Sequence, residues 1–247
     1  MNLSDLPLEK RPLTGGSRAV VIALDRGILT LSRHWIFFLN TFIFAYVGLP
    51  FLAPVFMKLG QTGPARAIYT LYSGLCHQLG YRSWYLFGER ANYPRDIFKQ
   101  FTGIDPNDLW AARGFIGNDQ LGFKVAYCER DVAIYGAILI FGLLYALPAF
   151  RKRVRPLNWF FYGLIGVAPI VLDGFSQLFS QYPYNTLAIF AWLPYRESTP
   201  FLRTLTGALF GLANAWLALP YLAASMADIR SELEIKLARV DAALSSR

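Results

Sequence analysis

The sequence predicts an all-α, polytopic membrane protein with four transmembrane helices, and three observations support this class. The chain has 247 residues, of which 55% are hydrophobic and 16% are charged, and its mean hydropathy is +0.34. Uncharged runs occupy residues 35–57, 132–150, 156–172 and 204–227, and about 20 apolar residues in a helix cross a hydrocarbon core of about 30 Å. These runs contain only isolated Asn, Thr or Ser, whereas the helices of a soluble protein would show polar faces at helical period.

The placement of basic residues predicts the orientation of the helices. Lys and Arg flank the first run on its amino-terminal side and the second run on its carboxyl-terminal side. These residues are Lys10, Arg11, Arg18, Arg26, Arg33, Arg151, Lys152, Arg153 and Arg155. Short basic flanks of this kind mark the cytoplasmic side of a membrane. We therefore expect a multi-pass protein of the cell (inner) membrane, with both termini in the cytoplasm and the regions 59–131 and 181–202 outside.

Residues 1–34 are expected to form a cytoplasmic segment before the first span. Apolar side chains recur at helical spacing along its second half, and charged side chains occupy the other side of the same helix. The apolar positions are Val21, Leu24, Ile28, Leu31 and Trp35. This pattern is typical of an amphipathic helix that lies in the membrane interface. A plain cytosolic extension of the first transmembrane helix is the alternative.

Residues 35–227 are expected to form the four-helix membrane domain, and its outer region 59–131 contains more than a loop. Two apolar patches in this region, at 68–75 and 84–87, are too short to span the bilayer. Patches of this length suit helices that lie in the outer interface or dip into it. The sequence therefore predicts interfacial helices on the outer side of the bundle.

The carboxyl-terminal segment 228–247 keeps an apolar seam after the fourth span. Its apolar residues at helical spacing are Ile229, Leu233, Leu237, Val240 and Leu244. Glu232 lies four residues before Lys236, a spacing at which the two charges support a helix. One interpretation is a cytoplasmic helix that docks on a membrane-protein partner or on the protein itself, and a solvated continuation of the fourth helix is the alternative.

The net charge of +8 does not indicate a nucleic-acid-binding surface. In the outer region 59–131, eight Lys and Arg residues nearly balance seven Asp and Glu residues, and the remaining excess flanks the spans. A protein that binds nucleic acid would show a basic stripe or patch on one surface. The expected partner is therefore the lipid bilayer.

Polar residues gather near the predicted outer ends of the four spans, in segments that are far apart in the sequence. They are Cys76, His77, Gln78, Arg82, Cys128, Arg130, Asp131, Asp173, Gln177 and Arg203. Polar groups are costly inside a membrane and mark functional sites. The sequence therefore predicts one outward-facing polar pocket, roofed by the outer region.

The only two cysteines, Cys76 and Cys128, both fall on the predicted outer side. In an oxidising compartment such a pair is expected to form a disulfide. A disulfide between residues 52 positions apart would stabilise the folded chain by roughly 4 kcal/mol, because it lowers the entropy of the unfolded state. Free thiols, or thiols with another use, remain a further alternative.

A metal site formed by Cys76, His77, Cys128 and Asp131 is the other interpretation. Cys128 and Asp131 are three residues apart, so they share a face if the helix begins there. Cys76 and His77 are adjacent, and on a helix adjacent side chains diverge by about 100°, so both can bind one ion only from a loop. Thiolate, imidazole and carboxylate ligands together suit zinc, and a catalytic zinc keeps one position open for water.

Asp173 is the strongest single candidate for a catalytic residue, and His77 is the second. Asp173 follows 17 uncharged residues and would lie roughly 10 Å below the outer end of the third helix. A charge at that depth needs a partner, and Arg203 or Arg130 could supply it. A structural ion pair between helices is the alternative to a proton-handling role. The remaining polar residues are expected to contact the ligand: Gln78, Arg82, Arg130, Tyr135, Gln177 and Arg203.

Four motifs occur in order along the chain. They are Cys76-His77-Gln78 with Arg82-Ser83, Cys128-Glu129-Arg130 with Ile134-Tyr135-Gly136, Asp173-Gly174 with Gln177, and Arg203 with Thr206-Gly207. Together they resemble a prokaryotic integral-membrane family classified as a domain of unknown function, whose members carry Cys-His-Gln ahead of Cys-x-Arg-Cys-Thr-Gly-Ile-Tyr. Here Asp131, Val132 and Ala133 stand where that pattern has Cys, Thr and Gly, so a Cys-x-x-Cys chelate is absent, although the aspartate can still bind metal. The resemblance supports the site and implies no activity.

The pocket suggests two classes of function. The first is a binding or assembly role, in which the pocket holds a small ligand, a lipid headgroup or a metal ion. The second is a metal-assisted, hydrolase-like membrane enzyme at the outer interface, with Asp173 or His77 as general base and arginines holding an anionic group. The sequence contains no Walker loop, HExxH or GxSxG motif that would name a reaction.

Overall fold

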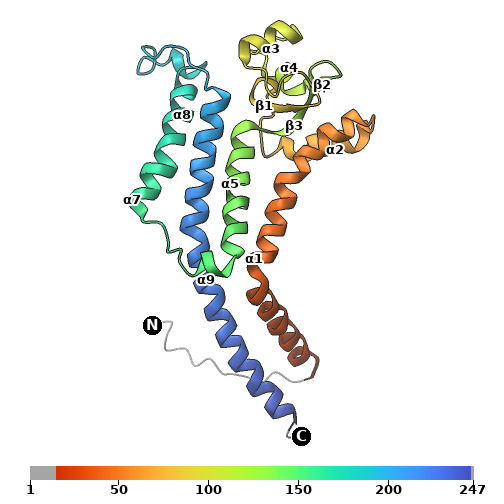
Figure 1. Cartoon of the computed structure of the whole chain (residues 1–247), viewed down its shortest axis with the longest axis vertical. Coiled ribbons are helices and arrows are strands. Elements are labelled where there is room, and N and C mark those ends of the chain that lie inside the picture. The colour runs from red at the N-terminus through yellow and green to blue at the C-terminus, as the bar shows by residue number, and fades with distance from the viewer. Residues whose placement is uncertain (1–14, 246–247) are drawn as a thin grey trace, which may run out of the picture. The chain divides into compact units, whose positions relative to one another are not determined.

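The computed structural model describes residues 15–245, and the chain divides into two compact units. The first unit combines the amino-terminal residues up to Phe38 with the residues from Leu222 onward, and the second is the continuous segment Leu39–Tyr221. Helix α1 (Gly15–Lys58) and helix α9 (Pro200–Ser245) each contribute to both units (Figure 1). The chain is 71% helical, which confirms the predicted helical class. A small sheet in the second unit was not predicted.

The first unit is a pair of helices joined by ion pairs. The start of α1 and the end of α9 run antiparallel, because residues further along α1 bind residues earlier in α9. The pairs are Arg26 with Asp241 at 2.9 Å, Arg33 with Glu234 at 2.8 Å, and Asp25 with Lys236 at 2.6 Å. Lys236 therefore binds the other helix instead of the predicted Glu232. Exposed pairs contribute less than about 1 kcal/mol each, so the burial of Leu29 and Leu237 between the helices also matters.

The apolar stripe predicted along residues 21–35 is divided between two faces of α1. Leu24, Ile28 and Leu31 are exposed, whereas Leu29 and Trp35 are buried. His34 has non-helical dihedral angles of φ −116° and ψ 17°. The kink thus lies one residue before the predicted start of the first span. Because Leu24, Ile28 and Leu31 are exposed, a place in the membrane interface stays a prediction for this segment.

Helix α9 continues from the bundle to Ser245 without a break, so the predicted carboxyl-terminal helix is part of it. Ile229, Leu233 and Val240 are half-buried on the predicted seam. The side chain of Leu244 and the basic residues Lys10 and Arg11 lie outside the described residues.

Three helices among the described residues are long and apolar enough to cross a membrane. They are Gly16–Lys58, Trp159–Phe179 and Pro200–Ala242. Helix α5 (Glu129–Ala146) has 18 residues but carries three charged residues, Glu129, Arg130 and Asp131, in its first turn, and it is not among these three helices. Four spans therefore remain a prediction, with α5 as the fourth.

In the second unit the order of the helices is α1, α5, α9, α8, as Figure 1 shows. The Asn40 amide of α1 donates to the Gly142 carbonyl of α5 at 3.0 Å. Helix α9 lies directly against α5 at Gly207 and Gly211, where added Cβ atoms would lie 2.7 Å and 2.2 Å from the Arg130 and Ile134 carbonyl oxygens. Small residues four apart permit this close approach between helices in a membrane.

On the other side of α9 lies a helical rod formed by α7 (Trp159–Phe161), the π-helical turn η3 (Tyr162–Val167) and α8 (Ala168–Phe179). The Tyr162 hydroxyl of the rod donates to the Asn214 side chain of α9 at 3.2 Å. The short helix α6 (Pro148–Arg151) follows α5, and the turn η4 (Tyr184–Thr186) follows α8.

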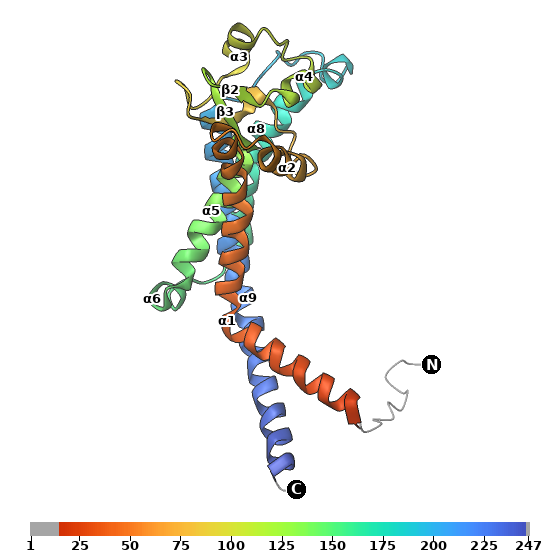
Figure 2. The same ribbon diagram turned by 90° about the vertical axis from the view of Figure 1, so that its right-hand side faces the viewer.

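The outer region forms a packed α/β subdomain at one end of the α5 and α8 helices, as both ribbon views show (Figure 2). Its elements are α2 (Thr62–Ser73), η2 (Gly80–Arg82), β1 (Ser83–Leu86), α3 (Arg95–Thr102), α4 (Leu109–Gly114), β2 (Gly117–Asn118) and β3 (Gly122–Cys128). The strands form an antiparallel sheet in the order β1-β3-β2.

The all-α prediction is wrong for this region, because the patch at 84–87 contributes to strand β1 and not to an interfacial helix. An apolar run of four residues does not by itself distinguish a strand from a helix. The pairing with β3 decides in favour of a strand, and the paired residues are 37 to 45 positions apart in the sequence. Gly122 permits the turn into β3 with φ +79°, where a Cβ would lie 2.3 Å from the Leu86 carbonyl oxygen.

Two aromatic cores hold the subdomain. One contains Tyr69, Tyr72 and Tyr127 under α2, and the other contains Tyr85 and Phe98 under α3. Strand β3 is buried from Gly122 to Tyr127 and passes directly into α5. This connection fixes Cys128 and the first turn of α5 at the end of the bundle.

Candidate functional site

The candidate site begins where strand β3 becomes helix α5. Cys128 is the N-cap of α5, and its sulfur accepts a hydrogen bond from the Asp131 amide at 3.5 Å. The Cys128 thiol in turn donates to the Asp131 carboxylate at 3.1 Å. A side chain at the N-cap satisfies backbone N–H groups that have no partner inside the helix. Cys128 and Asp131 therefore lie on one face, as predicted, because Cys128 caps the helix whose first turn contains Asp131.

Cys76 lies beside this turn and completes a cluster of three metal-ligand atoms. The ligand atoms of Cys76, Cys128 and Asp131 all lie within 4.8 Å of one another. The Cys128 amide donates to the Cys76 sulfur at 3.3 Å, and both cysteines are free thiols in this structure. The hydrogen bond to Cys76 and then burial raise the pKa of the Cys128 thiol well above its usual value. The two cysteines are close but not joined by the alternative disulfide.

The turn at residues 76–78 separates the predicted ligands. Gln78 has a positive φ of 50°, and its side-chain amide donates to the Tyr69 carbonyl at 3.0 Å. Cys76 and Gln78 are buried, while His77 between them is exposed. Of the four predicted metal ligands, His77 is therefore the one that the three-residue cluster does not include, because neighbouring side chains point in different directions.

A cavity of about 240 Å³ lies over the cluster. Nine of the residues that the sequence grouped together line it: Cys76, His77, Gln78, Arg82, Cys128, Arg130, Asp131, Gln177 and Arg203. Tyr135, which the sequence also assigned to the pocket, is not among the lining residues. Its ring packs at 4.8 Å from that of Tyr46 and at 5.8 Å from that of Tyr127.

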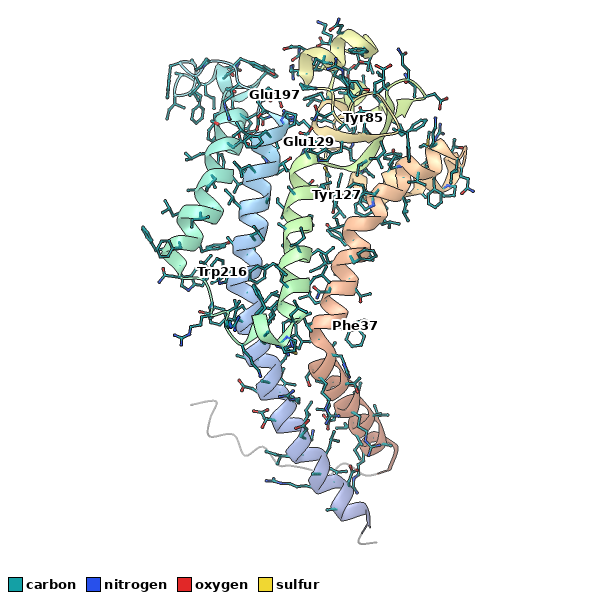
Figure 3. The ribbon with its side chains drawn as sticks, viewed as in Figure 1. Phe37, Tyr85, Tyr127, Glu129, Glu197 and Trp216 are labelled. Atoms are coloured by element: carbon teal, nitrogen blue, oxygen red, sulfur yellow. The ribbon has the colours of Figure 1, made fainter. Side chains whose placement is uncertain are left out.

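Glu197 is not among the residues that line the cavity, but it binds more polar side chains than any other described residue of the site. Its carboxylate accepts two hydrogen bonds from the Arg82 guanidinium, at 2.9 and 3.0 Å. Gln177 and Gln181 donate to it at 2.9 and 3.0 Å, and Arg203 forms an ion pair with it. Figure 3 shows Glu197 and Glu129 at the same end of the bundle, away from Trp216 (Figure 3). Glu197 thus connects the subdomain to α8 and α9.

Sequence reasoning missed Glu197, although a signal for it exists. Arg196 and Glu197 are the only charged residues between Asp173 and Arg203. A pair of charges in an otherwise uncharged segment of 29 residues is expected to have partners, because isolated charges near lipid are costly.

Arg203 and Glu129 form the most buried ion pair of the site. Their side chains are 4% and 0% exposed, and a guanidinium nitrogen lies 2.9 Å from the carboxylate. Glu129 is the first residue of α5 and Arg203 lies in the first turn of α9, so the pair joins the two helices where Gly207 brings them together. Of the two partners that the sequence offered for Asp173, Arg203 instead binds Glu129 and Glu197.

Asp173 has Arg130 as its partner, the second of the two that the sequence offered. The distance between guanidinium and carboxylate is 2.6 Å. The Arg196 guanidinium and the Ser198 hydroxyl each donate to the same carboxylate at 2.7 Å. A buried carboxylate with three donors holds the loop at 196–198 against α5 and α8. A proton-handling role for Asp173 stays a prediction.

The apolar helices together with this charged end define the class of the molecule: it is a helical membrane protein. Residues 115–217 match the model of a family described as "Predicted membrane protein (DUF2085)", a domain of unknown function. This match confirms the resemblance that the motifs indicated. The matched segment includes Cys128, Asp173 and Arg203 but begins after Cys76.

A similar curated protein is an uncharacterized protein of the archaeon Methanocaldococcus jannaschii. It is 25% identical over 198 residues, which cover 77% of this chain and 93% of that protein. No solved structure matches the chain. The comparisons thus support the class of membrane protein and leave its activity to be argued from the site.

Proposed function

We propose that this chain is a four-span protein of the cell (inner) membrane whose outward-facing cavity binds one divalent metal ion, most favourably zinc. Cys76, Cys128 and Asp131 are the protein ligands. The observation that carries the proposal is the clustering of these three ligand atoms within 4.8 Å. They come from segments separated by 52 positions and meet under a cavity that leaves room for a further ligand.

Two features favour the proposed topology. Helix α5 has 18 residues, which corresponds to about 27 Å and nearly matches the hydrocarbon core. The basic cluster 151–155 follows α5 at the end opposite to the cavity, and the Arg155 carbonyl accepts a hydrogen bond from the Trp216 ring of α9 at 3.0 Å. A basic loop with a neighbouring Trp is typical of the cytoplasmic interface.

The ligand chemistry favours zinc. Two thiolates are soft ligands and a carboxylate is a hard one, and zinc binds both kinds. A tetrahedral zinc site with Zn–S bonds of about 2.3 Å places its sulfur ligand atoms roughly 3.8 Å apart. Small side-chain rotations would bring the three atoms to this spacing. The fourth position faces the cavity, where water or the exposed His77 ring can enter. Bound zinc stabilises thiolates, so binding must release the thiol protons.

Elemental analysis of the protein purified in detergent with reduced thiols tests this proposal. We expect about one zinc per chain in the wild type, and Cys76→Ser, Cys128→Ser and Asp131→Asn should each lower zinc affinity roughly 100-fold or more, since they remove direct ligands. Asp119→Asn is the control, because Asp119 is exposed and lies away from the cluster. A wild-type protein that takes up no zinc with its thiols reduced contradicts the proposal.

A second function, metal-assisted hydrolysis of an anionic substrate at the outer interface, is favoured by one further observation. Arg82, Arg130 and Arg203 line the same cavity as the three ligands, so an anionic group could lie beside a metal-bound water. His77 at the rim would act as general base. Hydrolysis of a phosphoester by the zinc-loaded protein, lost in His77→Ala while zinc is retained, would support this role. Stoichiometric zinc without turnover would leave only the binding function.

A further inference from the structure

A second and larger cavity lies beside the metal cluster. Its volume is about 560 Å³, and it shares His77, Leu79 and Arg82 with the first cavity. This volume falls within the range of pockets that hold small organic ligands, roughly 300–1,000 Å³. None of the three proposed metal ligands lines it, so the proposed metal site leaves it available.

One wall of this cavity presents positive charge. The Arg95 guanidinium lies between the rings of Tyr81 and Tyr195, at 5.4 Å from each ring centre. One of its nitrogens donates to the Asn107 side chain at 2.5 Å, while Glu197 is no closer than 4.0 Å. Arg95 is therefore oriented by the two rings and has N–H groups to spare.

The lining as a whole favours an anion. Arg82 and Arg95 contribute to it, and the described residues that line the cavity include no carboxylate. Outside the lining, Glu197 is bound to Arg82 through both oxygens, and the Asp105 carboxylate accepts a hydrogen bond from the Asn107 side chain at 3.0 Å. The Arg95 guanidinium contacts two aromatic rings and has N–H groups without a hydrogen-bond partner among the described residues, so it can form a bidentate pair of hydrogen bonds with a phosphate group.

The cavity also has an apolar wall, which lies at the end of a candidate membrane span. Leu109 and Leu178 contribute to its walls, and Leu178 is the second-last residue of α8. The adjoining segment 181–195 has no charged residue, and its Tyr182 and Trp192 side chains are 82% and 76% exposed. Exposed aromatic residues at the end of a span are typical of the headgroup level of a bilayer.

We propose that this cavity binds the phosphate group of an anionic amphiphile, with Arg95 contacting the phosphate and the apolar wall contacting the hydrocarbon part. The position at the end of α8 favours a membrane phospholipid as the source. A soluble phosphate ester would share the same chemistry and is distinguished by experiment. The proposal does not depend on metal binding.

Two pairs of variants test the site in the full-length protein. Leu109→Glu places a negative charge at the wall, and Leu109→Gln is its neutral control. Leu109 is exposed and begins α4, and an acidic residue in the first turn is compatible with a helix. Arg95→Ala removes the proposed phosphate contact, and Lys99→Ala removes an exposed charge from the same helix.

Native mass spectrometry with phosphatidylglycerol or phosphatidylcholine measures lipid binding, and calorimetry with glycerol 3-phosphate measures the soluble alternative. We expect wild type to prefer phosphatidylglycerol, and Leu109→Glu and Arg95→Ala to bind it roughly tenfold or more weakly. Leu109→Gln and Lys99→Ala should bind like wild type.

The variants also define the contrary outcomes. If the same variant pattern is seen with glycerol 3-phosphate but not with lipid, the phosphate site is supported and its source is soluble. Equal binding by Leu109→Glu and Leu109→Gln overturns the proposal. So does a wild-type protein that prefers neither phosphatidylglycerol nor glycerol 3-phosphate over phosphatidylcholine. Because the metal ligands are intact in these variants, the metal proposal can fail or hold independently.

Discussion

Replacing Glu197 with Gln should destabilise the second unit. The substitution keeps the size of the side chain but removes the negative charge that faces the guanidinium groups of Arg82 and Arg203. Arg203 retains Glu129 as a partner, whereas Arg82 loses the carboxylate to which it donates both of its hydrogen bonds. A partly buried guanidinium would then be left without compensation.

The expected magnitude follows from burial. Breaking a buried ion pair by removing one partner costs about 3–5 kcal/mol, and solvent screening reduces this figure where the groups are partly exposed. The Arg82 and Glu197 side chains are 25% and 15% exposed, so we expect a loss at the lower end, about 3 kcal/mol. For a unit of this size, 1 kcal/mol shifts the unfolding midpoint by about 2–4 °C. The midpoint should therefore fall by about 6–12 °C.

Thermal unfolding of the detergent-solubilised protein, followed by loss of monodisperse protein in size-exclusion chromatography, measures this shift. Asp119→Asn is the matched control, because Asp119 and Lys58 form an ion pair whose side chains are 87% and 44% exposed. Such a pair contributes less than about 1 kcal/mol. If Glu197→Gln lowers the midpoint no more than Asp119→Asn does, the ion pairs of Glu197 with Arg82 and Arg203 do not hold the subdomain to the helices.

Three further predictions concern packing and protonation. Gly211→Ala should lower the unfolding midpoint, because its Cβ would lie 2.2 Å from the Ile134 carbonyl oxygen and overpacking costs about 1–3 kcal/mol. Burial lowers the pKa of Lys124 to about 7; the unfolded chain therefore binds more protons above pH 7, and this residue's contribution should make stability rise between about pH 7 and pH 9, a rise that Lys124→Met removes. Zinc affinity should increase with pH, by up to about 100-fold per pH unit if both thiols lose a proton on binding.

Each of these predictions has a simple control. Gly136→Ala should leave the midpoint unchanged, since a Cβ at Gly136 meets nothing within 4 Å, and equal effects of the two substitutions would refute the close helix contact. Unfolding midpoints of wild type and Lys124→Met with the same pH slope would show that Lys124 is not the group responsible. If the zinc affinity measured by titration does not change between pH 6 and pH 8, zinc does not bind through thiols that lose a proton on binding.

The helices and the grouping of polar residues could be predicted because both follow from local sequence. Uncharged runs have the length of a transmembrane helix. When such helices are antiparallel, the carboxyl-terminal end of one lies on the same side of the membrane as the amino-terminal end of the next. Once the ends are assigned, Cys128, Arg130 and Gln177 must lie near one another, and the structure has them in one cavity. The pairing of Asp173 with Arg130 follows from the same reasoning.

The remaining features depend on contacts that no local pattern contains. Strand β3 includes Lys124, which reads as a polar interruption, yet its ammonium group is buried and donates to the Gln78 and Arg113 carbonyl oxygens at 2.7 and 2.6 Å. The sheet was missed because that interruption hid the strand. Glu197 was missed for a similar reason, since its partners come from four other segments and only the folded chain brings them together.

The charge of the site also bears on which cation it would accept. Five arginines pair with three carboxylates around the cavity, so two positive charges are in excess, and Asp131 beside them reduces the excess to one. A cation held only by oxygen ligands, such as Ca²⁺ or Mg²⁺, would add two positive charges to this environment and should be repelled. Zinc that displaces one proton from each of Cys76 and Cys128 adds no net charge. The arginines that would oppose a hard cation therefore do not oppose a metal that binds thiolates.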